Sequence, residues 1–239
     1  MAGNAPYQEI MLQAVADALG LELLPQMAFV GGCTTALLIT DPVTREGVRF
    51  TEDVDLIVHV IGYGGWHSLL NQLRRKGFTE SPQDDITCRL RLKRRGHQDL
   101  IVDFMPDDDT ILGFTNRWYT DALTSALNYL LTTGACIRVV SPPYFVGTKL
   151  EAFNGRGNHD PLASRDVEDL LNLVDGRDTL LDEIRQAPLP LQTYIAEQFT
   201  QLLTNPDFAY CVQSTARGNT DREEIIFQRW EAIANLEYA

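Results

Sequence analysis

The sequence predicts an α+β protein in which a small mixed β-sheet with helices is followed by an all-helical C-terminal part. In the first 140 residues, short runs rich in β-branched residues alternate with segments of helical spacing. After Ser141-Pro142-Pro143 the apolar residues recur with helical spacing. The 239 residues, 44% of them hydrophobic, can bury a sizeable core. We therefore expect a sheet-containing core in residues 1–140 and a helical domain in residues 141–239.

Helices and turns of the first part are indicated by apolar spacing and by glycine or proline. Residues 7–19 and 66–76 have helical spacing, and each segment ends at a glycine, as helices often do. Gly31-Gly32 marks a tight turn between a strand and a helix. The predicted helices are 7–19, 34–39 and 66–76, with a loop marked by Asp41-Pro42 and Glu46-Gly47.

Strands of the first part are indicated by β-branched content or by strict alternation. Residues 54–61 are rich in valine and isoleucine, which favour strands. Residues 86–93 alternate apolar and basic side chains, the pattern of a half-buried strand. The predicted strands are 27–30, 54–61, 86–93, 100–105 and 137–140; a turn is expected at Arg95-Gly96-His97. The predicted C-terminal helices are 144–154, 164–175, 178–186, 190–204 and 221–236.

Charge and cysteine content exclude several classes of protein. The chain has 20 Lys and Arg against 33 Asp and Glu, a net charge of −13, which argues against non-specific coating of nucleic acid. The four cysteines form no C-x-x-C pair, so a disulfide framework and a zinc ribbon are not expected. Membrane-spanning runs and the pattern of a signal peptide are both missing from the sequence, and we expect a cytoplasmic protein.

Three aspartates on predicted strands form the strongest functional signal. Asp53 and Asp55 stand at the start of a strand, and side chains two residues apart point to the same face. Asp103 interrupts an apolar strand, where a charge is costly unless it is paired or bound to a metal. Carboxylates that converge suit Mg²⁺, and three can hold two such ions. The alternative is a solvated strand start with capping aspartates.

The glycine pair fits the same chemistry. Gly31 and Gly32 allow the backbone to approach a phosphate closely, and the N–H groups at the start of the next helix favour an anion. Thr34 can add a hydroxyl donor. We therefore expect Gly31, Gly32 and Thr34 to bind the phosphates of a nucleotide.

This pattern resembles the nucleotidyltransferase superfamily that includes DNA polymerase beta: Gly-Gly, a gap, Asp-x-Asp, and a third Asp on a later strand. It is more similar to the AbiEii-type toxin nucleotidyltransferases of bacterial type IV toxin–antitoxin systems, relatives of the MenT toxins. Residues 49–55 (RFTEDVD) match the Arg-x-Ser/Thr-x-Asp-x-Asp element of that family. Residues 148–152 (TKLEA) and 164–170 (SRDVEDL) match its Lys-Leu-x-Ala and Arg-Asp-x-x-Asp-Leu elements. The resemblance covers about residues 27–175.

The resemblance implies roles for individual residues. Asp53 and Asp55 would hold the metal in a site for two Mg²⁺ ions, and Asp103 would complete it and accept the proton of the acceptor hydroxyl. Lys149 would contact the triphosphate of the substrate, as a solvated charge whose removal leaves the fold intact. Asp166 and Asp169 would orient Lys149 or the metal site, so that the helical domain contributes to the nucleotide site.

The alternative for Lys149 is a surface lysine, and the alternative for Asp166 and Asp169 is a pair of charges at a helix start. Two departures from the family pattern are present. The gap between Gly32 and Asp53 holds 20 residues, which predicts an inserted loop, and Cys33 stands where Ser or Thr is usual.

A basic run precedes the Asp103 strand. Arg89, Arg91 and Lys93 alternate with apolar residues, so they share one face of the predicted strand. Gly96 makes this strand and the Asp103 strand antiparallel neighbours. The face could bind the phosphates of an RNA acceptor, or it could be a solvated face that protects a sheet edge.

The expected function is thus a Mg²⁺-dependent nucleotidyltransferase that transfers a nucleoside monophosphate from an NTP to an acceptor hydroxyl. The resemblance implies an RNA acceptor, such as a tRNA, and a protein antitoxin as partner. The alternatives are transfer to an antibiotic, another small molecule or a protein, and a non-catalytic module that binds a nucleotide or a partner. A glycosyltransferase also uses Asp-x-Asp, but 52 residues before Asp53 leave little room for its preceding half domain.

Overall fold

The computed structural model describes residues 5–82, 84, 86–94, 96–156 and 159–236. It has the predicted α+β class, with a mixed sheet followed by helices. The chain divides into a sheet unit, residues 1–34 and 49–141, and a helical unit, residues 35–48 and 142–239. The chain therefore passes between the units after Thr34, after Val48 and after Ser141. The first two passages were not indicated by the sequence.

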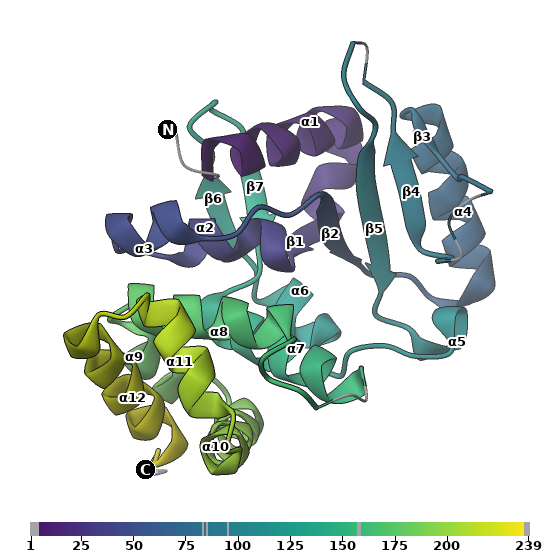
Figure 1. Cartoon of the computed structure of the whole chain (residues 1–239). Helices are drawn as coiled ribbons and strands as arrows, with labels where there is room; N and C mark the ends of the chain where they lie inside the picture. The colour runs from purple at the N-terminus through teal and green to yellow at the C-terminus, as the bar shows by residue number, and fades with distance from the viewer. Residues whose placement is uncertain (1–4, 83, 85, 95, 157–158, 237–239) are drawn as a thin grey trace. The chain divides into compact units, whose positions relative to one another are not determined.

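Within the described residues, the sheet unit contains a seven-stranded sheet of order β3-β4-β5-β2-β1-β7-β6 (Figure 1). Strand β2 pairs in parallel with β5, and β1 pairs in parallel with β7, whereas the other neighbours are antiparallel. The strands are β1 (Met27–Val30), β2 (Asp53–Val58), β3 (Phe78–Thr79), β4 (Arg89–Leu92), β5 (Leu100–Pro106), β6 (Leu127–Leu130) and β7 (Cys136–Val139).

The central strands are the most hydrophobic part of this unit, and they carry the aspartates. All four residues of β1 are buried, and Val54, Leu56, Val102 and Phe104 are almost completely inaccessible to solvent. The five predicted strands are present. Strands β3 and β6 were missed, because β3 has two residues and β6 is largely exposed at one edge of the sheet.

Helices α1 (Ala5–Leu23), α4 (Gly62–Arg75), α5 (Asp109–Leu112) and α6 (Tyr119–Thr124) complete the sheet unit. Gly20 has φ +66° and breaks the regular geometry of α1, where the sequence predicts a helix end. Gly77, with φ +96°, follows α4 in the left-handed conformation that favours glycine. The predicted turn at Arg95 lies outside the described residues, and the following Gly96 has φ +74°.

The helical unit begins with the segment between the glycine pair and β2. The prediction of a loop at Asp41-Pro42 and Glu46-Gly47 is wrong, because α3 (Pro42–Gly47) occupies these residues. The side chain of Asp41 accepts a hydrogen bond from the Thr44 amide and Pro42 takes the first turn, the ordinary start of a helix. A short 3-10 turn, Gly32–Thr34, leads from the sheet unit into α2 (Thr35–Leu38).

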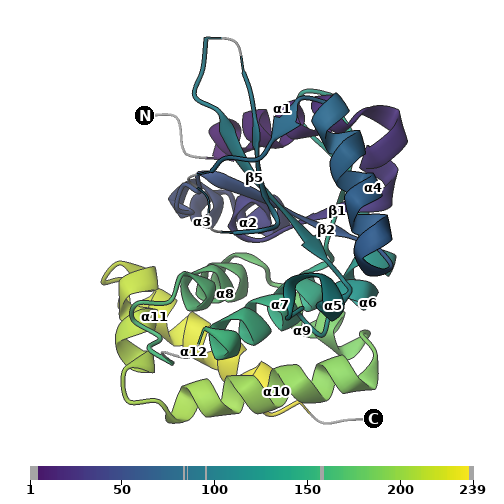
Figure 2. The ribbon, with the colours of Figure 1, turned by 90° about the vertical axis from the view of Figure 1, so that its right-hand side faces the viewer.

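The remaining helices of this unit pack around α8 and α12 (Figure 2). They are α7 (Pro142–Gly155), α8 (Arg165–Gly176), α9 (Leu180–Arg185), α10 (Leu189–Thr204), α11 (Phe208–Ala216) and α12 (Thr220–Ala234). Trp230 of α12 is fully buried, stacks on Phe199 at 3.9 Å between ring centroids and donates its indole N–H to the Phe199 carbonyl. Helix α11 was missed by the sequence analysis. Among the described residues, none of the helices has both the length and the apolarity needed to cross a bilayer.

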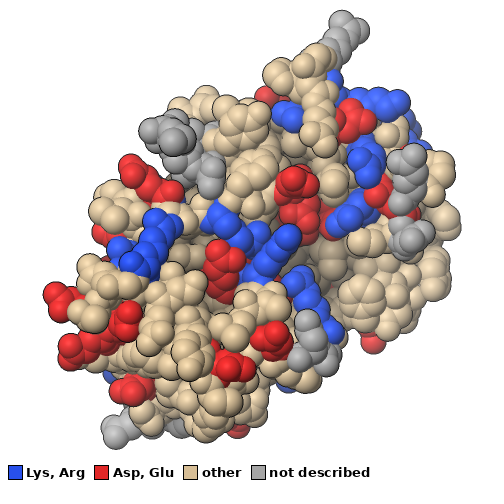
Figure 3. Space-filling view, viewed as in Figure 1, with Lys and Arg blue, Asp and Glu red and all other residues tan. Residues whose placement is uncertain are grey.

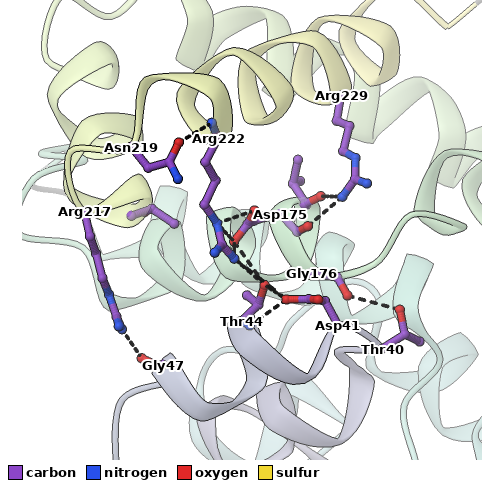
Figure 4. A network of polar contacts seen from close by, with 12 residues as sticks. Thr40, Asp41, Thr44, Gly47, Asp175, Gly176, Arg217, Asn219, Arg222 and Arg229 are labelled. Atoms are coloured by element: carbon purple, nitrogen blue, oxygen red, sulfur yellow. Dashed lines mark hydrogen bonds and ion pairs between the residues drawn. The ribbon is translucent and has the colours of Figure 1, made fainter.

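Residues 35–48 are bound to the helical unit by a polar network around Arg222 of α12 (Figure 4). The Arg222 guanidinium donates to both carboxylate oxygens of Asp175 and to the Thr44 hydroxyl. Thr40 and Asp41 donate their amides to the carbonyl of Gly176 at 2.9 Å each. Gly176 itself leaves no room for a side chain, since a Cβ there would lie 2.6 Å from Ile39. We call this network, centred on Arg222, Asp175 and Thr44, the Arg222 clamp.

Candidate metal centre and nucleotide site

Two parallel strands bring the three predicted aspartates together. Asp55 of β2 and Asp103 of β5 are directly paired in the register of the sheet. Asp53 lies two residues before Asp55, on the same face of β2. One carboxylate oxygen from each of the three residues lies within 4.8 Å of the other two. The predicted convergence of Asp53, Asp55 and Asp103 is therefore confirmed.

The cluster fits a hard cation. Asp103 is only 7% exposed, and Asp53 and Asp55 are half-buried, so water compensates their mutual repulsion only in part. Carboxylate oxygens are the ligands that Mg²⁺ favours in proteins. Three such groups at this spacing supply the donor set that a divalent ion, or a pair of them, requires.

Arg89 brings a positive charge into direct contact with the cluster. Its Nε and Nη2 atoms donate to the two oxygens of Asp103 at 2.8 and 2.7 Å. These hydrogen bonds, and secondarily the charges of Asp103 and Asp53, raise the pKa of Arg89 above its ordinary range. A two-point bond fixes the carboxylate plane, so Asp103 is held in one orientation. Arg89, predicted to contact an acceptor, is thus a partner of the third aspartate.

Gly31 makes room for the Asp55 carboxylate. A Cβ atom at Gly31 would lie 2.0 Å from Oδ2 of Asp55, and the residue has φ +80°. At Gly32 a Cβ would lie 2.7 Å from the Arg49 guanidinium and 2.7 Å from the Thr51 methyl group. From the sequence, the glycine pair was expected only to approach phosphates. In the structure it also packs closely against three residues of the 49–55 motif.

Thr34 is buried and engaged within the turn that follows the glycine pair. Its hydroxyl donates to the Gly31 carbonyl at 2.9 Å, and its amide donates to the same carbonyl at 3.1 Å. The hydroxyl therefore closes the turn. Its predicted contact with a nucleotide stays a prediction.

Lys149 lies in a buried ion cluster of the helical unit. Its Nζ atom lies 2.6 Å from Oδ2 of Asp169 and 3.1 Å from Oδ1 of Asp166, and Arg156 approaches Asp166 at 2.8 Å. The side chains of Lys149, Asp166 and Asp169 are 9%, 3% and 0% exposed. Burial alone lowers the pKa of Lys149, but the charges of Asp169 and Asp166 outweigh it and the pKa is raised.

Two expectations about this cluster have different outcomes. The expectation that Lys149 is a solvated charge is wrong, because its ammonium is enclosed by two carboxylates. The pairing of Asp166 and Asp169 with Lys149 is present, as the family roles imply, since the two aspartates lie three residues apart on α8. Contact of Lys149 with a triphosphate stays a prediction.

The basic strand is an antiparallel neighbour of β5, as predicted, with Arg89 opposite Asp103. Arg91 is also paired, because its Nε and Nη2 atoms donate to both oxygens of Asp84 at 2.8 Å. Lys93 lies beyond β4 and is exposed. Figure 3 shows basic and acidic side chains interspersed on the face in view. The expected continuous basic face is therefore interrupted by carboxylates at Arg89 and Arg91, and binding of an acceptor there stays a prediction.

Comparisons with known proteins relate the chain to a family and to a solved structure. The model of a family described as nucleotidyl transferase AbiEii toxin, type IV TA system, matches residues 21–233. Among solved structures, the chain is similar to an antigenic nucleotidyltransferase-like protein from Paracoccidioides brasiliensis. That likeness covers 87% of this chain and 90% of the other, with 22% sequence identity and a TM-score of 0.47. A search of curated proteins gives no match.

Proposed function

Because this chain belongs to the family of AbiEii nucleotidyl transferase toxins of type IV toxin–antitoxin systems, we propose that it transfers a nucleoside monophosphate from an NTP to a hydroxyl group of RNA. The description of the family names a nucleotidyl transferase. The acceptor and the metal are our proposal. The acceptor is a tRNA, and a protein antitoxin restrains the activity. Both rest on the resemblance to the family that the motifs of residues 49–55, 148–152 and 164–170 carry.

The convergence of Asp53, Asp55 and Asp103 carries the proposal. Two of these carboxylates lie on β2, and the third lies on β5 directly across from Asp55; together they are suited to hold two Mg²⁺ ions. Mg²⁺ held there would neutralise charge on the triphosphate and so favour displacement at the α-phosphate. A non-catalytic binding module has no need of three converging acids.

We assign a separate role to each residue of the site. Asp53 and Asp55 hold the metal site, and Asp103 receives the proton of the attacking hydroxyl. Arg89 keeps Asp103 in one orientation through the bonds to its two oxygens. We assign the polyphosphate to the backbone N–H groups of the turn at Gly31 and Gly32, next to Asp55.

The test is transfer of label from α-³²P NTPs. The protein is incubated with each of the four NTPs, Mg²⁺ and total RNA, and products are separated into RNA, protein and small molecules. We expect label in RNA, dependent on Mg²⁺, and its loss in Asp53→Asn and Asp55→Asn. Asp121→Asn is the matched control, because Asp121 is an exposed aspartate of the same unit on α6.

The outcome also separates the alternatives. Label in protein or in a small molecule would reject RNA as the acceptor while leaving the nucleotidyltransferase intact. Label in no fraction with any of the four NTPs would contradict the proposed reaction.

A further inference from the structure

We propose that a hollow beside β2 and β5, the strands that carry the three aspartates, receives the terminal base of a single-stranded RNA acceptor. This inference rests on the proposed function and names a subsite for its acceptor. The hollow has a volume of about 150 Å³ and lies within the sheet unit. The lining residues that matter here are Tyr7, Phe50, Glu52, Arg94, His97 and Ile101. We call it the Tyr7–Phe50 hollow.

Two exposed aromatic rings form one wall of the hollow. Tyr7 is 59% exposed and Phe50 is 40% exposed. Their centroids are 5.8 Å apart at an interplanar angle of 73°, so each ring supports the other edge to face. Aromatic side chains held open to solvent in this way are the surfaces on which proteins stack unpaired bases.

The hollow adjoins the metal centre through the sheet. Ile101, which lines the hollow, is the cross-strand partner of Asp53. Glu52, also in the lining, directly precedes Asp53 in the chain. Directly opposed residues of neighbouring strands lie about 5 Å apart. A base in the hollow would thus belong to a nucleotide whose sugar is close to the carboxylates.

The side of the sheet on which the hollow lies favours the acceptor over the NTP. Strand β2 lies between β1 and β5. The glycine turn follows β1, whereas the hollow includes the start of β5. In phosphoryl transfer the attacking and leaving oxygens lie roughly in line on opposite sides of phosphorus. If the pyrophosphate leaves toward Gly31 and Gly32, the acceptor enters from the flank of β5, which also carries Asp103.

Charge and size favour a single nucleotide. Arg94 donates two hydrogen bonds to the Gln98 carbonyl, at 3.1 and 2.9 Å, and these fix its guanidinium without cancelling its charge. His97 adds a second basic side chain, while Glu52 and Asp99 are acidic. This mixture suits one base with its phosphate and does not suit a long phosphate track. A cavity of about 150 Å³ takes a ring the size of benzene.

Binding of RNA without NTP tests the proposal independently of catalysis. The probe is a short single-stranded RNA with a fluorophore at its 5′ end, made either with a normal 3′-terminal nucleotide or with an abasic one. Fluorescence anisotropy gives the Kd of each RNA for the parent, Phe50→Ala, Tyr7→Ala and Phe50→Tyr. Tyr63→Ala is the control, because Tyr63 is a 60% exposed aromatic residue of the sheet unit outside the hollow.

The parent should bind the normal RNA at least about fivefold more tightly than the abasic RNA, the lower end of the range for stacking of one base. Phe50→Ala and Tyr7→Ala should lose this preference, whereas Phe50→Tyr and Tyr63→Ala should keep it. In the transfer assay, the two alanine variants should raise the KM for RNA and leave the KM for NTP within about twofold of the parent.

Failure of this inference differs from failure of the proposed function. If the parent labels RNA and Phe50→Ala retains both the preference for a terminal base and the KM for RNA, the hollow is not the acceptor subsite. If the alanine variants raise the KM for NTP instead, the base in the hollow is that of the NTP and the proposal is overturned. If the parent labels no RNA, the proposed function fails, whatever the anisotropy shows.

Discussion

Arg89 on β4 donates one hydrogen bond to each oxygen of Asp103, the residue directly across from it on β5. The pair lies at the edge of a cluster of three carboxylates, so one guanidinium balances part of a charge of −3. A cation bound at the three carboxylates would compensate more of this charge. If a metal binds at these carboxylates, Arg89 links its affinity to the stability of the protein.

Arg89→Met should lower the free energy of unfolding by about 1–3 kcal/mol without a metal, because a largely buried carboxylate loses both donors. It should also enlarge the rise in Tm produced by saturating Mg²⁺, since the variant site is more negative by one charge. Thermal unfolding with and without Mg²⁺ measures both effects. Arg89→Lys, which keeps the charge, should give a smaller change. An equal rise in Tm for parent and Arg89→Met would contradict the link.

Gly31→Ala should abolish nucleotidyl transfer, because its Cβ would displace the Asp55 carboxylate. The left-handed conformation adds about 1–2 kcal/mol of backbone strain. Gly134→Ala is a close control, since Gly134 has φ +95° but open space around its Cβ position. The control should lose similar stability and keep its activity. Transfer rates and urea unfolding of the two variants separate strain from the clash, and full activity in Gly31→Ala would refute the close approach.

Lys149→Met should destabilise the helical unit by about 3–5 kcal/mol, because it leaves Asp166 and Asp169 buried with less compensating charge. Urea unfolding measures the loss. The triple variant Lys149→Met, Asp166→Asn, Asp169→Asn should recover most of the stability, since it removes the buried charges together. A single variant as stable as the parent would show that the cluster is solvated after all.

The thiol of Cys211 should make folding sensitive to high pH. Burial, followed by the charges of Asp160 and Asp207, raises its pKa from 9.0 to about 11. The unfolded thiol loses its proton above pH 9 while the folded one keeps it, so its stabilising effect is complete below pH 9 and lost toward pH 11. Between pH 8 and 10.5 the parent should lose about 1–2 kcal/mol more stability than Cys211→Ala. Urea unfolding of the parent and of Cys211→Ala at pH 8 and at pH 10.5 gives the comparison. Equal losses of stability in the two proteins would contradict the raised pKa.

The sequence predicted the sheet core and its carboxylates because both depend on short-range patterns. Side chains two residues apart share a face of a strand, so Asp53 and Asp55 could be placed before any fold was known. The hairpin of β4 and β5 also followed from local alternation and from Gly96. Strand β6 gave no such signal, because its leucines are exposed and do not alternate.

What the sequence did not predict depends on contacts between distant residues. Pro42 and Gly47 are typical of a loop, yet they are the first and last residues of α3. The helix forms because Asp41 caps it and because the Gly176 carbonyl accepts hydrogen bonds from the amides of Thr40 and Asp41. The burial of Lys149 likewise depends on two aspartates that lie 17 and 20 residues further along the chain. Motif matching identified these residues but could not show that they neutralise one another.

The Arg222 clamp has a consequence for synthesis on the ribosome. Thr44 and Arg222 are separated by 178 residues. At elongation rates of about 5–20 residues per second, the arginine is made roughly 10–35 s after its partner. For that interval the nascent chain already contains the glycine turn and, soon after, the three aspartates. The segment that joins them lacks its contact with Arg222 and depends on others, such as the hydrogen bonds of Thr40 and Asp41 to Gly176 of α8. A chain that terminates before α12 never acquires the contact with Arg222, so premature release should yield a product in which α8 holds this segment without that arginine.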